Sequence, residues 1–227
     1  MTGINSGSVS RDDITAVVKP QRHPAEERLI DYVSGSGSHS WELFIDAHLS
    51  LCSECRDQVS KLRALGGALL EKIPHEDLPE GMEERVLDLL DSAEITGFPG
   101  PKHATLPDLP QSVTSLLPSD PAKITWDTDV LTGGEALCLG SVIEKENHSS
   151  SSYLFLLRIP AGERIFDRGE VTELGYLLVL NGGLLCDEGD LSVGDIAGLD
   201  QVREKYYAID DLSLTYCLLL LTKEVRS

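Results

Sequence analysis

The sequence predicts an α+β protein of two domains, in which a helical N-terminal half precedes an antiparallel β half. Apolar residues recur at helical spacing between positions 24 and 92. Six prolines fall between positions 95 and 122, a density that can continue neither a helix nor a central strand. From position 123 onward, short apolar runs alternate with turn residues, which is typical of a β-sandwich or a small barrel.

These sequence patterns divide the 227 residues into four parts. We expect a polar, mobile tail over residues 1–19, a helical domain over 20–95, a Pro-rich linker over 96–122 and a β domain over 123–227. No apolar run reaches the ~20 residues of a membrane-spanning helix. The first residues lack the apolar segment of a secretory signal. The protein is therefore expected in the cytoplasm, without a membrane partner.

Four helices are predicted in the first half. Pro24 suits a first helical position, and Gly35 breaks the helix that follows. Ser38 or Ser40 can cap a second helix and Ser53 a third, while a fourth covers about 80–92. The apolar sides of these helices are expected to hold Leu29, Tyr32 and Val33; Trp41, Phe44 and Ile45; Cys55, Val59, Leu62 and Leu69; and Met82, Val86, Leu89 and Leu90.

Five strands are predicted in the second half, separated by turn signals such as Asn181-Gly182-Gly183 and Gly194-Asp195. They cover Ala136–Ile143, Tyr153–Ile159, Tyr176–Leu180, Leu184–Asp187 and Leu212–Thr222.

The net charge of -19 is spread along the chain, with 9 Lys and Arg against 18 Asp and Glu in residues 1–100, and 10 against 20 thereafter. Such a field repels DNA and RNA, which excludes a nucleic-acid-binding protein, and it attracts a basic protein. A role in solubility alone would also account for the charge.

The stretch His48-Leu-Ser-Leu-Cys52-Ser-Glu-Cys55 is the most informative in the sequence. His48 and Cys52 are about one helical turn apart, and Cys52 and Cys55 have the usual spacing of two thiolates on one tetrahedral zinc. Two unrelated cysteines or a redox pair are the alternatives to a metal site.

A closed zinc site needs a fourth ligand, and His23 at the start of the first helix is the first choice. His39, early on the second helix, is its competitor. Two neutral imidazoles and two thiolates offset the charge of Zn²⁺, so such a centre can be buried at low cost. We expect one structural zinc ion at His23, His48, Cys52 and Cys55.

Together with Leu29 to Gly35 and Leu62 to Leu70, these four residues resemble the zinc-binding anti-sigma domain, in which the first two histidines have a similar separation. With the β half, the plan resembles the ChrR-type cytoplasmic anti-sigma factors. The resemblance implies an anti-sigma factor that sequesters an extracytoplasmic-function sigma factor, inhibits transcription initiation, and releases its partner under oxidative-type stress. It also implies that the fourth helix binds the partner, through Met82, Val86, Leu89 and Leu90. Ordinary helix packing is the alternative for each of these residues.

The second half of the chain is similar to a cupin in motif spacing, from Gly162 to Gly182, but not in its metal ligands. The four ligand positions of the cupin motifs hold Arg168, Glu170, Gly175 and Lys205. Glu173 lies two residues from the usual carboxylate and cannot rebuild a site alone. We therefore predict a zinc-stapled four-helix domain followed by a cupin-like β-barrel or sandwich that carries no metal and no enzymatic activity. Arg168, Glu170 and Lys205 form a salt-bridge cluster, which could bind a small molecule, or are solvated.

Two other functions stay open at this point. One is a cupin-family dioxygenase or isomerase regulated by the zinc domain. The other is a thiol redox switch at Cys52 and Cys55, which is compatible with an anti-sigma factor because oxidation would eject the zinc.

Overall fold

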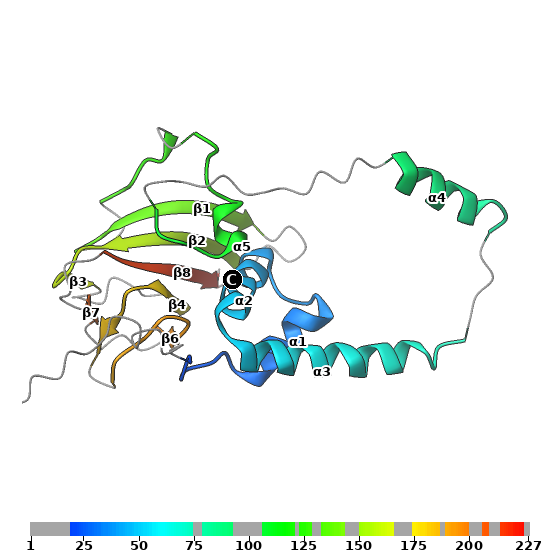
Figure 1. The fold of residues 1–227 in the computed structure, drawn as a ribbon, viewed down its shortest axis with the longest axis horizontal. Helices are drawn as coiled ribbons and strands as arrows, with labels where there is room; N and C mark the ends of the chain where they lie inside the picture. Colours follow the sequence, from blue (N-terminus) through cyan, green and yellow to red (C-terminus); the bar gives the residue numbers. More distant parts are fainter. Residues whose placement is uncertain are drawn as a thin grey trace, which may run out of the picture.

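The computed structural model describes residues 19–74, 79–92, 106–120, 123–128, 133–143, 150–165, 174–186, 189–199, 206–208 and 214–224. The helices are α1 (Glu26–Ser34), α2 (His39–Leu51), α3 (Ser53–Leu70), α4 (Met82–Ser92) and α5 (Gln111–Thr114). The strands are β1 (Glu135–Ile143), β2 (Ser150–Ile159), β3 (Arg164–Ile165), β4 (Leu174–Asn181), β5 (Leu184–Leu185), β6 (Ile196–Gly198), β7 (Tyr206–Ala208) and β8 (Thr215–Glu224). The predicted order of a helical half and a β half is confirmed (Figure 1). Within these residues, no helix combines the length and the apolarity that crossing a bilayer requires.

The ends of the first three helices follow from residues that suit them. Gly35 ends α1 in the left-handed conformation, with φ of 67°. The Ser38 hydroxyl accepts a backbone N–H from the first turn of α2 at 3.3 Å, so this predicted cap is confirmed. The predicted cap of α3 is wrong, because Ser53 is already helical. The cap is Cys52, whose sulfur accepts the Cys55 N–H at 3.4 Å.

The β half consists of two antiparallel sheets that face each other across a shared apolar core (Figure 1). The larger sheet has the order β1-β2-β8-β4-β6 and the smaller one β3-β7-β5. The predicted cupin-like sandwich is therefore confirmed as an architecture. The sequence did not indicate β3, β6 and β7, because two or three residues are too few to show a strand period.

The larger sheet is buried on both faces, and this explains its unbroken apolar runs. In β8, Cys217 and Leu219 belong to the core between the sheets, whereas Leu218 and Leu220 belong to the core on the opposite face. Strands covered on both faces lose the apolar and polar alternation of a half-exposed sheet.

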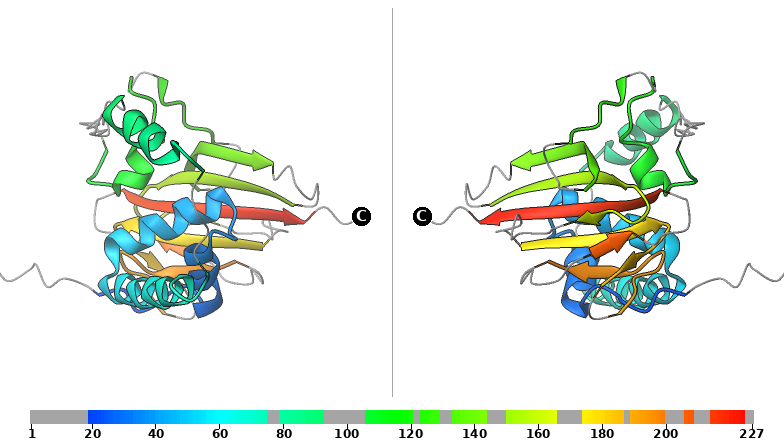
Figure 2. Two further views of the ribbon diagram at one scale, coloured as in Figure 1. Left: turned by 90° about the vertical axis from the view of Figure 1, so that its right-hand side faces the viewer. Right: turned by 90° about the vertical axis from the view of Figure 1, so that its left-hand side faces the viewer.

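Helix α2 covers the outer face of the larger sheet, and α5 packs beside α2 (Figure 2). The rings of Trp41 and Phe44 on α2 lie 4.9 and 6.4 Å from the ring of Tyr176 on β4. Residues 106–120, which belong to the predicted linker, contribute the buried side chains of Leu109 and Val113 to the same core. The helical and β halves therefore share one core, while the predicted domain limits stay predictions.

The second half of α3 and helix α4 carry exposed apolar side chains. Helix α3 buries only Cys55 and Val59. Leu69, which was expected on the same apolar side, is 58% exposed, so that part of the prediction is wrong. On α4 the four residues predicted to bind a partner are exposed by 39 to 68%.

We expect Phe44→Ala to lower the free energy of unfolding by about 3–5 kcal/mol, because Phe44 is fully buried between the helices and the larger sheet. Urea denaturation followed by circular dichroism measures this change. Leu69→Ala is the control, and its effect should stay within about 0.5 kcal/mol because the side chain is exposed. Equal midpoints for the two variants would show that the shared core does not stabilise the fold.

Candidate metal centre

Three of the four predicted ligands come from the junction of α2 and α3. His48 lies in the last turn of α2, and Cys55 lies in the first turn of α3. Cys52 is the residue between the two helices, with extended dihedral angles of -116° and 110°. This extended residue changes the direction of the chain between α2 and α3, so that the ligand atoms of all three residues come close together.

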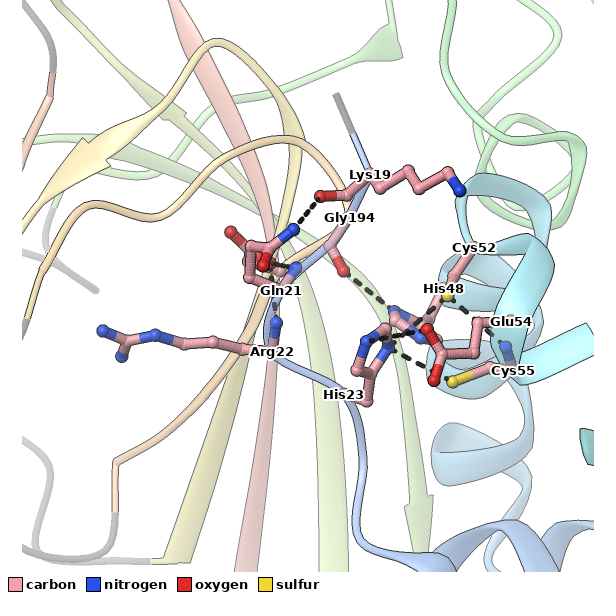
Figure 3. A network of polar contacts seen from close by, with 10 residues as sticks. Lys19, Gln21, Arg22, His23, His48, Cys52, Glu54, Cys55 and Gly194 are labelled. Carbon is pink, nitrogen blue, oxygen red and sulfur yellow. Dashed lines mark hydrogen bonds and ion pairs between the residues drawn. The ribbon is translucent and has the colours of Figure 1, made fainter. Parts of the chain in front are cut away.

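His23 joins them from the extended segment that precedes α1. One ligand atom from each of His23, His48, Cys52 and Cys55 can be chosen so that all four lie within 4.8 Å of one another. Figure 3 shows the two imidazoles and the two sulfurs converging from three parts of the chain. The structure thus brings together the four residues that the sequence predicts, as a cluster that could hold a metal ion.

The distances within the cluster fit a tetrahedral metal site. The Nδ1 atom of His23 lies 3.5 Å from the sulfur of Cys52 and 3.4 Å from that of Cys55. A tetrahedral zinc with Zn–N of about 2.05 Å and Zn–S of about 2.3 Å separates its nitrogen and sulfur ligands by about 3.6 Å. A zinc ion would therefore need little rearrangement of these three side chains.

His48 provides an independent indication of a cation. Its Nδ1 donates a hydrogen bond to the backbone carbonyl of Gly194 at 2.9 Å, so Nε2 is the unprotonated nitrogen of the neutral ring. Nε2 is buried and has no hydrogen-bond partner in the described part of the chain. A buried polar atom without a partner is costly, and coordination to a metal would satisfy it.

Burial shifts the acid–base properties of two ligands in opposite directions. It lowers the pKa of His48 to about 4, and the neighbouring His23 acts in the same direction. It raises the pKa of the Cys55 thiol to about 12, with a further contribution from Cys52. Without a cation the centre therefore holds a neutral imidazole and a protonated thiol. A divalent cation meets an imidazole ready to bind but must displace the thiol proton.

His39 does not take part in the cluster. It lies in the first turn of α2 with its side chain 64% exposed, and its Nδ1 is 3.8 Å from a carboxylate oxygen of Glu42. Glu54, in contrast, lies 3.8 Å from Nε2 of His23, whereas Nδ1 of the same ring lies near the sulfurs. Of the two candidates for the fourth position, the structure places His23 at the centre.

The degenerate cupin pocket predicted around Arg168, Glu170, Glu173 and Lys205 lies outside the described residues and remains a prediction. The described part of the space between the two sheets is filled with apolar side chains. These are Ala136, Leu157, Ile159, Ile165, Leu177, Val179, Leu184, Leu191, Ala197, Leu199, Cys217 and Leu219.

Sequence reasoning identified the Gly194-Asp195 pair as a turn and as the start of the second cupin motif, and the structure places it beside the candidate metal centre. Asp195 is buried, and its carboxylate accepts the backbone N–H groups of Gln21 and Arg22, directly before His23. No local signal could have indicated this contact, because more than 140 residues separate its partners.

No protein-family model matches the chain. The anti-sigma-E factor ChrR of Cereibacter sphaeroides is 29% identical to it over 192 residues, which cover 81% of each chain. A crystal structure of Rhodobacter sphaeroides SigE in complex with the anti-sigma ChrR matches with a TM-score of 0.68 at 26% identity, over 89% of this chain and 99% of the other. A cupin 2 conserved barrel domain protein from Salinispora arenicola matches with a TM-score of 0.33 at 15% identity, over 46% of this chain and 85% of the other.

The similarity to ChrR extends across both halves of the chain, in sequence and in fold. The resemblance to ChrR-type anti-sigma factors, which the histidine and cysteine motif predicts, is therefore confirmed.

Proposed function

We propose that the protein is a cytoplasmic, non-enzymatic anti-sigma factor. Its helical domain, held by one structural zinc ion, binds an extracytoplasmic-function sigma factor and keeps that protein from initiating transcription. The observation that carries the proposal is the four-residue cluster at the helix junction, in a chain similar to ChrR along most of its length. The sigma factor as partner follows from the solved relative, which is an anti-sigma protein in complex with SigE.

The donor set supports zinc as the metal. Two imidazoles and two thiolates in a closed, mostly buried arrangement are typical of structural zinc rather than of a catalytic site, which keeps an open position. Helix α1 has nine residues and buries only Leu29 of its own side chains. Such a short helix is marginal alone. Structural zinc contributes on the order of 10–16 kcal/mol in small domains, enough to fix α1 beside the junction.

The exposed apolar side chains of α4 support it as a partner-binding element. Val86, Leu89 and Leu90 are 48 to 68% exposed, and acidic residues such as Glu83 and Asp88 lie on the same helix. An amphipathic helix of this kind can lay its apolar face into a groove of the partner. The net charge of -19 favours a partner with a basic surface.

Release under oxidative stress fits the chemistry of the two cysteines. Hydrogen peroxide can accept two electrons from the thiolates of Cys52 and Cys55. The S–S bond of a disulfide forms, the O–O bond of the peroxide breaks, and its two oxygens take up two protons from solvent and leave as two water molecules. The disulfide is a poor ligand, so zinc would leave. Both cysteines are buried, and the Nδ1 atom of His23 lies 3.5 and 3.4 Å from their sulfurs, so displacement of His23 would expose them to an oxidant.

We expect the purified full-length protein to contain one zinc ion per chain by inductively coupled plasma mass spectrometry. Cys55→Ser should lose the metal, because a hydroxyl is a weak substitute for the thiolate. Cys138→Ser is the matched control and should keep it, because Cys138 is exposed and outside the cluster. Protein without zinc would refute the metal assignment. Two metal ions per chain would instead support the cupin enzyme.

We expect Leu89→Asp combined with Leu90→Asp to weaken binding to the partner sigma factor by at least about 30-fold, as loss of an interface hot spot does. Both side chains are exposed, so the variant should fold and keep its zinc. Calorimetric titration gives the affinity, and metal analysis verifies the fold. Leu185→Asp, at an exposed apolar position of the β half, is the control. Unchanged affinity in the double variant would exclude this face of α4 from the interface.

A further inference from the structure

The turn between β5 and β6 reaches from the β half to the metal centre. The carbonyl of Gly194 accepts the Nδ1 proton of His48 at 2.9 Å, and both groups are buried. Because a carbonyl oxygen can only accept, this bond fixes the tautomer of the ring and aims Nε2 at the sulfurs. One ligand of the proposed zinc is thus oriented by a backbone group of the β half.

Asp195, the next residue, holds the segment that carries a second ligand. One of its carboxylate oxygens accepts the N–H groups of Gln21 and Arg22 at 2.5 and 2.9 Å. The other oxygen accepts the N–H of Ser192 at 2.8 Å, within the turn itself. The N–H of Ile196 in turn donates to the carbonyl of Arg22 at 3.1 Å. Hydrogen bonds to a buried carboxylate are stronger than those between neutral groups, so the residues before His23 are firmly placed.

The fit between the turn and the helical half is close. Gly194 has φ of 90°, and a Cβ atom there would lie 2.5 Å from Cγ of Pro20 and 3.4 Å from Cβ of Leu51. A side chain at this position would push the turn away from α2 and from the segment that leads to His23. Glycine therefore lets the backbone come near enough for the hydrogen bond to His48.

We propose that the Gly194-Asp195 turn is a positioning element of the metal centre, which makes zinc binding and the docking of the β half on the helices one coupled equilibrium. The inference rests on the proposed zinc site. Cys52 and Cys55 lie at the α2–α3 junction, whereas the turn orients the ring of His48 and holds the two residues before His23.

The coupling is reciprocal. Partners that orient ligating side chains typically change metal affinity by about 10–100-fold. If docking of the turn strengthens zinc binding, zinc must strengthen the docking by the same factor. A change in the β half that displaces the turn would therefore weaken zinc binding directly. It would not need to alter the Pro-rich stretch that joins the two halves in sequence.

The test uses full-length Asp195→Ala loaded with zinc, and measures the rate at which a chromogenic chelator removes the metal. We expect release to become about 10–100-fold faster than in wild type. Asp195→Asn keeps an acceptor oxygen for Gln21 and Arg22, so its rate of zinc release should lie between those of wild type and Asp195→Ala. Asp190→Ala is the matched control, since Asp190 is exposed nearby and should leave release unchanged. The visible spectrum of the Co²⁺-substituted protein should shift in Asp195→Ala and stay unchanged in Asp190→Ala, because the ligand field changes with the placement of His23.

Hydrogen exchange on the wild-type protein provides a readout that does not depend on whether the variants fold. Removal of zinc should speed exchange of the amides of Ser192 and Ile196, and should leave the β1–β2 pairing protected. Unchanged exchange, or wild-type release from folded Asp195→Ala, would overturn the coupling but not the zinc site. Wild-type protein without zinc would overturn the proposed function and, with it, this inference.

Discussion

Helix α2 is the element on which the rest of the structure depends, because one short helix serves both the shared core and the metal centre. Trp41 and Phe44 pack on the larger sheet, and His48 in its last turn faces Cys52 and Cys55. The helix cannot tilt or slide on the sheet without moving an imidazole whose Nε2 has an orientation fixed from the other side. Packing of α2 in the core therefore also fixes the position of His48 in the centre.

The helices divide into a buried group and an exposed group, and the division indicates where a partner would bind. Helices α1 and α2 and the start of α3 surround the ligands, with the Tyr32 hydroxyl hydrogen-bonded to Asp46 across α1 and α2. Beyond Val59 the side chains of α3 become mostly exposed, and the apolar side chains of α4 are exposed as well. Exposed apolar side chains at this density are typical of protein-binding surfaces. The four-residue cluster thus lies at the start of α3, and the exposed apolar side chains of that helix lie toward its other end.

Much of this arrangement could be predicted from local patterns. The spacing of His48, Cys52 and Cys55 and the cap at Ser38 each depend on a few neighbouring residues, so the sequence indicates them directly. The Cys52 cap of α3 was missed because sulfur is an uncommon capping acceptor. Helix α5 was missed because four residues among prolines carry no period. The apolar run of β8 did contain the information that both sheet faces are covered, and reading it as a buried strand would have predicted the shared core.

The contact between the turn and the centre could not be predicted from local patterns, because it depends on how the two halves of the chain pack. Gly194-Asp195 is an ordinary turn signal, and nothing in its neighbourhood indicates His48 or the residues before His23. The packing gives the four ligands unequal support. The two cysteines are held by helices whose hydrogen bonds are local. His23 is the least buried ligand, and its segment is held by a carboxylate from the β half. A disturbance of the interface would therefore act on the two histidines before the two cysteines. The Nδ1 atom of His23 lies 3.5 and 3.4 Å from the sulfurs of Cys52 and Cys55, so displacement of His23 would loosen the part of the centre that oxidation of the cysteines would also disrupt.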